Sequence, residues 1–513
     1  MNGDMLLETF CFRCVARKIA VLAGVALAAG LTARLAAADA PQAPSARDAA
    51  VATRPPTANC LKLLFSGPQD LTDTWGKLHF GVTPVRLIRE CEDPGFTVVG
   101  CFPRPGGAWE LFGQQMTQLS RGKEPYEETN SWKLIRVTTR DGAKFESQET
   151  VLEQPPAPWT GHCAMEYNPD AHEYLLLKLK VDRSGFAYTA FFSSDGKQWQ
   201  EYPGNPVFYD GDSMSLFWNP ALRRFVCVSK SLQPYRKHLR DHGGATPALG
   251  DDSLRDRRVL MMRSSCDGRH WEPSVTLPDV WNRNGRKASI PAGYLTVPDA
   301  DDPPDLEFYS GNAFWYHDRA YMTVLNYAAS PLTPRKHGPQ LDNEWWTSSD
   351  GLRWERPARG VNALEVFPQI PRLETHPLIL GGNILFPRRN LLLGLPEDRI
   401  SYVGARANGE FSTRPFRMPD ADLLLNAASP APERPFAKEQ AYVMVTVLDD
   451  KGQTVPGFES EKCVTRNEDR RDIPLKWGDA SARQLAGKTI RLRFFLRSAN
   501  VYAVTGRTDG GMK

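Results

Sequence analysis

The sequence predicts an all-β fold: a five-bladed β-propeller followed by a C-terminal β-sandwich. The first observation is a phrase that recurs at residues 193–199 (SSDGKQW), 265–271 (SCDGRHW) and 348–354 (SSDGLRW). The second is its spacing of 72 and 83 residues, which leaves room for one four-stranded sheet with its loops. The third is that helical periodicity is absent after the first forty residues. Repeated small sheets, each carrying an aromatic turn motif, are typical of propellers.

The Asp-Gly pair inside this phrase predicts a tight hairpin turn. Glycine accepts the positive φ of such a turn, and aspartate can accept hydrogen bonds from the backbone just beyond it. The aromatic residue three positions after the glycine then lies on the returning strand. Weaker copies occur at 139–145 (TRDGAKF) and 406–411 (RANGEF). Three unrelated turns are the alternative, but the tryptophan recurs at one offset, which favours a repeat.

The blades follow from short apolar runs between turn residues. Blade one is predicted from strands at 96–102, 108–115 and 131–139, and blade two from strands at 162–168, 174–181 and 186–193. Blade three is predicted from strands at 213–219, 224–229 and 258–264, with an insertion at 232–257. Blade four is predicted from strands at 311–317, 320–327 and 344–348, and blade five from strands at 376–381, 384–387, 399–405 and one at Phe411.

The pattern places the propeller at residues 59–415, its first thirty residues packing on the blades as a lead-in segment. Alternating runs at 442–448, 489–496 and 501–504 predict the β-sandwich, at residues 430–505. Residues 506–513 are expected to be a disordered tail.

The N-terminus predicts export. Basic residues precede an apolar run at 19–33, and small residues at 36–38 permit cleavage, which gives a signal peptide at 1–38. The run is short for a membrane span, so we expect none after cleavage and a periplasmic or extracellular location. An uncleaved anchor is the alternative. Residues 39–58, rich in alanine and proline, are expected to be a linker.

Composition limits the possible partners and cofactors. The net charge of +3 and the absence of a basic run interleaved with aromatics argue against nucleic acid. Seven cysteines would remain after signal removal, at spacings that match no metal site. A Cys91–Cys101 disulfide is possible, with buried free thiols as the alternative. We expect no cofactor and no metal; spacing gives Ca²⁺ in the channel no support.

Ionisable residues gather before the innermost strand of the predicted blades. Those strands line the central channel of a propeller, so their starts converge. The candidates are Asp93, His162, Asp212, Asp305, Glu307, Glu374 and His376. A ring of carboxylates suits glycosidic cleavage, in which one acid protonates the leaving oxygen and one carboxylate attacks or activates water. Crowding raises one pKa and keeps that group protonated. The alternative for each residue is a solvated turn position.

The chain resembles a known group through several short stretches. They are 167–169 (YNP), 217–220 (FWNP), 342–354 (DNEWWTSSDGLRW), 394–400 (GLPEDRI) and 487–494 (GKTIRLRF). They resemble the five-bladed propellers of the furanosidase superfamily, which includes glycoside hydrolase families 32 and 43. They are more closely similar to secreted propellers with a glycosyl-hydrolase-like fold from planctomycete-type bacteria.

The resemblance implies a catalytic carboxylate at the start of blade one, a pKa-tuning acid in blade two and a general acid in blade three. Asp93 fits the first place. Blade two offers His162, with Glu166 inside the strand, and blade three offers Asp212 where those enzymes carry glutamate.

These observations predict an exported glycoside hydrolase acting on an oligo- or polysaccharide. The expected carboxylates are Asp93, Asp212 and Glu307. The residues expected to contact the sugar are His162, Asp305, Tyr309, Glu374, His376 and Arg399. A non-catalytic carbohydrate-binding or cell-surface interaction propeller is the alternative. Carboxyl groups about 5.5 Å apart would favour retention, and about 6.5–9.5 Å would favour inversion.

Overall fold

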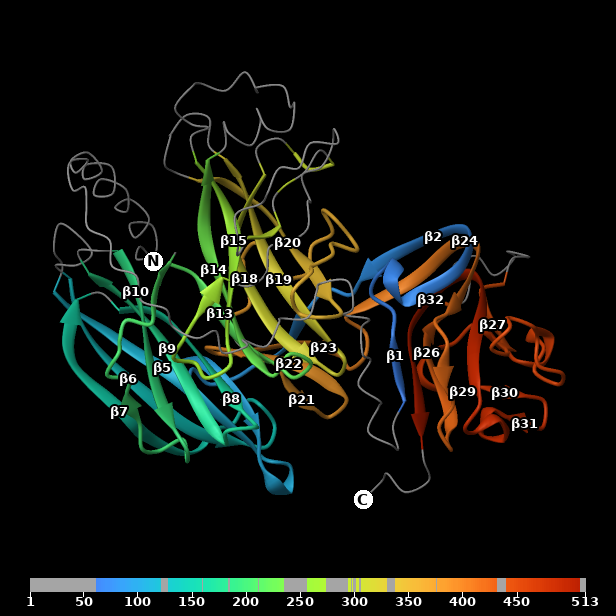
Figure 1. Cartoon of the computed structure of the whole chain (residues 1–513), viewed down its shortest axis with the longest axis horizontal. Helices are drawn as coiled ribbons and strands as arrows, with labels where there is room; N and C mark the ends of the chain where they lie inside the picture. Colours follow the sequence, from blue (N-terminus) through green and yellow to red (C-terminus); the bar gives the residue numbers. More distant parts are fainter. Residues whose placement is uncertain are drawn as a thin grey trace, which may run out of the picture. The chain divides into compact units, whose positions relative to one another are not determined.

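The computed structural model of the chain describes residues 61–507, apart from several segments (Figure 1). Those segments are 121–127, 159, 183–184, 211, 235–255, 274–293, 297, 299–300, 304–305, 330–336, 375 and 431–439. The expected signal peptide and linker therefore lie outside the described residues, as do Asp305 and nearly all of the blade-three insertion. The described chain is all-β: a five-bladed propeller and a C-terminal β-sandwich, as predicted.

Blades one and two are antiparallel sheets of neighbouring strands. Blade one contains β4 (Thr97–Pro103), β5 (Trp109–Ser120), β6 (Thr129–Thr139) and β7 (Glu146–Pro158). Blade two contains β8 (Thr160–Asn168), β9 (Glu173–Asp182), β10 (Gly185–Ser193) and β11 (Gln200–Glu201), with β12 (Phe208–Asp210) also paired to β10. The predicted strands are confirmed here within a few residues, because tight turns join them.

Blades three and four follow the same plan, and their strands lie side by side in Figure 1. Blade three contains β13 (Met214–Asn219), β14 (Arg224–Pro234), β15 (Asp256–Ser265) and β16 (Glu272–Pro273), with β17 (Tyr294–Thr296) also paired to β15. Blade four contains β18 (Leu306–Tyr316), β19 (Arg319–Ala329) and β20 (His337–Ser348).

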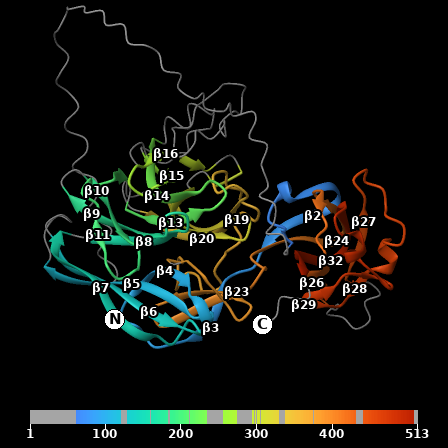
Figure 2. The same ribbon diagram turned by 60° about the horizontal axis from the view of Figure 1, so that its bottom comes forward.

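Blade five differs from the prediction. Its sheet contains β21 (Leu378–Leu380), β22 (Asn383–Arg388), β23 (Leu391–Pro396) and, as the outermost strand, β3 (Arg86–Glu90). The expected strands at 399–405 and Phe411 were wrong for this blade. Instead, a strand from before blade one pairs with β23 and closes the ring, as Figure 2 shows. Closure of this kind depends on a pairing between distant residues and leaves no local turn motif.

The predicted Asp-Gly turns are confirmed in atomic detail. At Ser193–Trp199, Asp195 Oδ1 accepts hydrogen bonds from the backbone N–H of Lys197 (2.8 Å) and Gln198 (2.9 Å). Ser193 Oγ accepts a bond of 2.9 Å from the Gly196 N–H, and Gly196 has a φ of +70°. The copies at 265–271 and 348–354 repeat these bonds, and the weaker copy at 139–145 keeps the turn with Thr139 in the serine position.

Each of these turns also helps to join two blades. A Cβ added to Gly268, in blade three, would lie 2.9 Å from Leu175 of blade two. Gly142, in blade one, faces Leu378 of blade five in the same way. The proposed fifth copy at 406–411 is not such a turn, because it lies inside β24 (Ser401–Thr413), a strand of the β-sandwich.

We expect Gly268→Ala to destabilise the fold by about 2–4 kcal/mol, from the left-handed backbone and the clash with blade two together. Gly106→Ala is the matched control, because Gly106 also has positive φ but has no neighbour within 4 Å of the added Cβ. Its cost should stay near ~1 kcal/mol. Urea denaturation measures both. Equal losses would show that the turn does not contribute to packing between blades.

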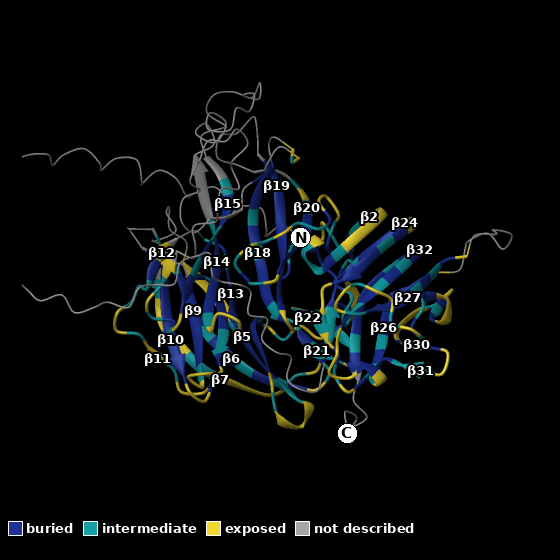
Figure 3. Cartoon of the chain, turned by 45° about the vertical axis from the view of Figure 1, so that its right-hand side comes forward, coloured by how far each residue is buried: buried dark blue, intermediate teal, exposed yellow. Residues whose placement is uncertain are grey.

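The blade strands are apolar on both faces because each blade is covered by two neighbours. In β9, Leu175, Leu176 and Leu177 are all fully buried (Figure 3). Leu175 and Leu177 pack with blade three, and Leu176 packs with blade one. A continuous apolar run, rather than an alternating one, is expected for strands buried on both faces.

The C-terminal β-sandwich is built around one long strand, β32 (Thr489–Arg507). Strands pair with both halves of β32 and enclose a core that includes Phe65, Phe411 and Phe494. Its other strands are β1 (Lys62–Leu64), β2 (Leu71–Val82), β24, β25 (Phe416–Arg417), β26 (Asp422–Ala428), β27 (Tyr442–Leu448), β28 (Val464–Arg466) and β29 (Asp469–Pro474). A separate hairpin pairs β30 (Lys476–Trp477) with β31 (Ala480–Ser481).

The segment at 59–90 therefore has a different role from the predicted one. It supplies β1 and β2 to the sandwich and β3 to blade five. The last strand also continues to Arg507, past the expected start of the tail. Cys91 and Cys101 are free thiols, so the possible disulfide between them is not formed.

Candidate functional site

Seven side chains from four blades form the candidate site, which we call the mouth group. They lie at or near the starts of the innermost strands, or on strands beside them. The members are His162 of blade two, Asp212 and Lys230 of blade three, Tyr309 of blade four, and Arg372, Glu374 and Arg388 of blade five.

One side of the mouth group is an ion pair on an aromatic ring. Lys230 Nζ, from β14, lies 2.5 Å from Asp212 Oδ1 and 4.0 Å from the centre of the Tyr309 ring. Burial would raise the pKa of Asp212, but the Lys230 cation outweighs it and holds that pKa below its ordinary value. Asp212 is therefore ionised at neutral pH while 31% of its side chain remains exposed.

The other side is a carboxylate held by two guanidinium groups. Arg372 Nε donates to Glu374 Oε1 at 3.1 Å, and Arg388 Nη2 lies 3.7 Å from the same oxygen. Burial would raise the pKa of Glu374, but the Arg372 and Arg388 cations lower it overall. Arg388 also donates through Nη1 to the backbone carbonyl of Arg372 at 2.5 Å. This bond holds the Arg388 side chain next to the Arg372 backbone.

His162 is the residue whose pKa is influenced by charges on both sides. Burial is the main cause that lowers its pKa, to about 4, and the Arg372 and Lys230 cations act in the same direction. The Glu374 and Asp212 carboxylates oppose this shift, so both act on the same imidazole. At neutral pH the ring is uncharged and can both donate and accept a hydrogen bond, as a sugar hydroxyl requires.

We expect His162 to stay neutral until the pH falls to about 4. The NMR chemical shifts of its imidazole ring, measured against pH, can follow this titration. The unfolded chain protonates this histidine near its ordinary pKa of about 6.5, so the unfolded state binds more protons between pH 6.5 and 4. Folding stability should therefore fall as the pH decreases through this window, and His162→Gln should remove that part of the dependence. A titration midpoint at about pH 6 or above, near the ordinary value for histidine, would contradict the assignment.

A second pair of ionisable side chains lies further along the innermost strands. Glu166 is four residues beyond His162 in β8, about 13 Å along a strand. Its Oε2 lies 3.5 Å from His376 Nδ1 and accepts a bond from the Trp218 N–H, while its Oε1 accepts one from the Tyr167 N–H. Burial raises the pKa of Glu166, only partly offset by His376. Both carboxylate oxygens are engaged by the backbone, which suits a structural role.

Three other predicted residues have partners outside the mouth group. Asp93 is exposed and accepts a bond from the Gly95 N–H (2.9 Å), as a turn residue does. Glu307 is buried and bound by the Arg258 guanidinium (2.9 Å) and backbone N–H (3.1 Å). Arg399 donates to Asn426 and Asp469 of the β-sandwich.

Three cations of the mouth group were not predicted: Lys230, Arg372 and Arg388. A search for carboxylates before innermost strands does not find them, because they are cations. Lys230 also lies within β14, the second strand of blade three, and Arg388 is the last residue of β22 in blade five. A usable indication exists for Lys230. It follows the apolar run of residues 225–228 in a strand buried on both faces, where a lysine needs a partner.

Among the described residues, one group could bring three metal-ligating atoms together: His317, Glu397 and Asp398. Lys62 Nζ lies 2.7 Å from Asp398 Oδ2 and 2.9 Å from His317 Nε2. The ammonium group therefore offsets part of the negative charge of this cluster and competes with any ion for its ligands. This group ties β1 of the sandwich to the residues after blade five.

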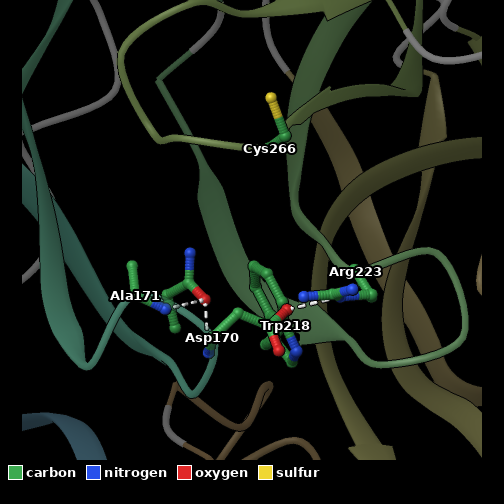
Figure 4. A pocket seen from close by; sticks show the side chains of 6 residues that line it. Asp170, Ala171, Trp218, Arg223 and Cys266 are labelled. Atoms are coloured by element: carbon green, nitrogen blue, oxygen red, sulfur yellow. Dashed lines mark hydrogen bonds and ion pairs between the residues drawn. The ribbon is translucent and has the colours of Figure 1, made fainter.

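A cavity of about 440 Å³ lies at the far ends of the innermost strands of blades two and three. Asn168, Asp170, Ala171, Trp218, Arg223 and Cys266 line it (Figure 4). Arg223 Nε donates to Asp170 Oδ2 at 2.8 Å, and both side chains are well exposed. No carboxylate pair faces this cavity among its lining residues, so it does not offer the chemistry of the mouth group.

The sequence matches no protein-family profile and no curated protein sequence. Solved structures show similarity at low identity. A glycosyl hydrolase from Bacteroides ovatus is 13% identical with a TM-score of 0.35, covering 60% of this chain and 85% of that chain. A β-fructofuranosidase from Schwanniomyces occidentalis, complexed with fructosyl-erythritol, is 9% identical with a TM-score of 0.34, covering 83% and 97%.

A family 117 glycoside hydrolase from Zobellia galactanivorans is 9% identical with a TM-score of 0.30, covering 55% of this chain and 75% of that chain. Among the described residues no helix has the length and hydropathy that a membrane span requires. The chain is thus a five-bladed propeller with structural similarity to glycoside hydrolases at low identity.

Proposed function

We propose that the protein is a glycoside hydrolase that cleaves an oligo- or polysaccharide at the mouth group. The proposal rests on Asp212 of blade three and Glu374 of blade five, which are far apart in sequence. Each is a partly exposed carboxylate in an ion pair, and each opposes the lowering of the pKa of the same histidine, His162. Two carboxyl groups flanking one glycosidic bond are what most glycosidases use. Both carboxyl groups are partly exposed and can meet a substrate.

Asp212 is the carboxylate that faces the anomeric carbon in this proposal. It is ionised at neutral pH, so it can attack that carbon or activate a water molecule, and it can stabilise the positive charge of the transition state. Lys230 keeps Asp212 ionised and holds it in place, while Tyr309 supports the lysine.

Glu374 is the proton donor in this proposal. In the free protein it is held ionised by Arg372 and Arg388, so a substrate must change its environment before it can carry the proton. His162, which is neutral and whose pKa both carboxylates influence, would bind a sugar hydroxyl and orient the ring. Asp93 and Glu307 are given no catalytic role in this proposal, because Asp93 forms a turn and Glu307 is bound by Arg258.

A binding-only propeller is the second candidate, and the ion pairing of both carboxylates favours it. A glycan screen on the mature chain separates the two candidates. It measures both the release of reducing ends, which reports cleavage, and the binding of the protein to each glycan. Cleavage supports hydrolysis, and NMR of the product's anomeric proton gives the stereochemistry. Binding to a glycan, with no cleavage of any glycan in the screen, would contradict hydrolysis and support a binding-only role.

We also propose that the protein is exported, because the N-terminal residues carry the features of a signal peptide. N-terminal sequencing of the protein recovered from the periplasm or medium tests this. A mature end near Asp39 is expected, and recovery only of uncleaved chain from the cytoplasm would contradict it.

A further inference from the structure

The mouth group contains more positive than negative charge. Lys230, Arg372 and Arg388 are three cations, and Asp212 and Glu374 are two carboxylates. His162 is neutral at pH 7. These described residues therefore leave one net positive charge among partly buried side chains, where an unbalanced charge is costly.

The excess lies on the two arginines of blade five. Both guanidinium groups point at one oxygen, Glu374 Oε1, so they share a single carboxylate. Among the described residues, the Arg372 side chain donates one hydrogen bond, from Nε to Glu374 Oε1. Its two terminal nitrogens, Nη1 and Nη2, donate none to a described residue. A guanidinium whose two terminal nitrogens form such a fork can bind a second anion through two of its oxygens.

Arg388 adds a fixed charge beside this fork. Its side chain is only 20% exposed, and its bond to the Arg372 carbonyl holds it in place. Burial lowers the pKa of Arg388, and the single carboxylate of Glu374 does not restore it because Arg372 and Arg389 add positive charge. A cation in this position gains from an anion that arrives with the substrate.

We propose that the sugar recognised at the mouth group carries an acidic substituent, a carboxylate or a sulfate ester, bound by Arg372 and Arg388. This rests on the function proposed above and names its substrate class. A singly charged substituent balances the excess charge of the described residues, whereas a neutral sugar leaves it unbalanced.

The same contact explains how Glu374 can acquire its proton. Three groups act on Glu374 in the free protein: Arg372, Arg388 and His162, and the two arginines hold its pKa down. An anion bound to both guanidinium groups offsets their field, so the pKa of Glu374 rises when an acidic sugar binds. A neutral sugar would leave Glu374 ionised and unable to protonate the leaving oxygen.

Affinity electrophoresis of the full mature chain tests the proposal. The probes are two polyuronates (polygalacturonate and alginate), one sulfated galactan (carrageenan) and one neutral galactan. We expect retardation by the polyuronates or the sulfated galactan, at least tenfold weaker in Arg388→Met. Arg388→Lys, which keeps the charge but loses the bond to the Arg372 carbonyl that holds the charge in place, should be intermediate. Arg417→Met, at an exposed position of β25 in the sandwich, is the control for attraction to any polyanion and should bind as the wild type does.

The outcomes are distinct. Retention on polyuronates alone identifies a carboxylate, and retention on the sulfated galactan alone identifies a sulfate ester. Equal binding of acidic glycans by the Arg388 and Arg417 variants, with thermal unfolding showing both folded, overturns the inference. Preferred binding and cleavage of the neutral galactan overturns it too but leaves the proposed hydrolase intact. Specific binding of an acidic glycan without cleavage of any glycan supports the inference and overturns the hydrolase.

Discussion

Asp212→Asn is expected to lower kcat on a cleaved glycan by about 10²–10⁴-fold, the usual contribution of a positioned acid, base or nucleophile. Asparagine keeps the size of the side chain but removes the charge that faces the anomeric carbon. It also leaves Lys230 without its 2.5 Å partner, so the positive charge of the mouth group grows. Initial rates of reducing-sugar release measure the effect, and KM should change far less than kcat.

Two further variants make this result interpretable. Glu374→Gln should lose activity to a similar extent, because the amide cannot supply a proton. Asp93→Asn should remain within about twofold of the wild type, since Asp93 is an exposed turn residue outside the mouth group. If Asp212→Asn is folded and keeps more than a tenth of the wild-type rate, Asp212 is not the catalytic carboxylate.

Glu110→Gln is expected to cause the largest loss of stability, about 3–5 kcal/mol. Glu110 is fully buried in β5, and its two carboxylate oxygens are bound by the guanidinium groups of Arg104 and Arg136, one oxygen each. The Tyr174 hydroxyl of blade two also donates to it, at 3.2 Å. Removing the carboxylate charge leaves the Arg104 guanidinium without its carboxylate partner, and leaves Arg136 with only Glu149, at 3.5 Å, at the interface between blades one and two.

The control for this variant lies in the same blade. Glu153 pairs with Lys133 at 3.1 Å, but 59% of its side chain is exposed. Glu153→Gln should therefore cost no more than about 1 kcal/mol, as exposed ion pairs do. The urea midpoint of the first unfolding transition compares the two. A loss for Glu110→Gln no greater than that for Glu153→Gln would mean that the buried network does not hold the two blades together.

The sequence predicts the blades wherever the pattern is local. The Asp-Gly turns at 141, 195, 267 and 350 form as expected, because aspartate, glycine and the preceding serine or threonine define the turn between them. Blade five escaped prediction because its outermost strand, β3, precedes blade one in the chain. The pair Asn408–Gly409 has a similar local pattern but lies in a bulged strand of the sandwich, where tertiary pairing overrides turn propensity.

The site could be predicted in part for the same reason. The rule that innermost strands begin at the central opening placed His162, Asp212 and Glu374, which the structure brings together. The same rule admitted Asp93 and Glu307, which satisfy it by position but are engaged elsewhere. The sequence could not separate these cases, because the side-chain partners come from other blades. The three cations could not be found by searching for carboxylates at all.

The most direct test of the site is a crystal structure of the Asp212→Asn variant bound to an oligosaccharide that the wild type cleaves. The account predicts the scissile bond at the mouth group, with its anomeric carbon about 3–3.5 Å from the side chain at position 212 and its glycosidic oxygen facing Glu374. Sugar bound only elsewhere, for example in the cavity beside Trp218 and Arg223, would contradict it.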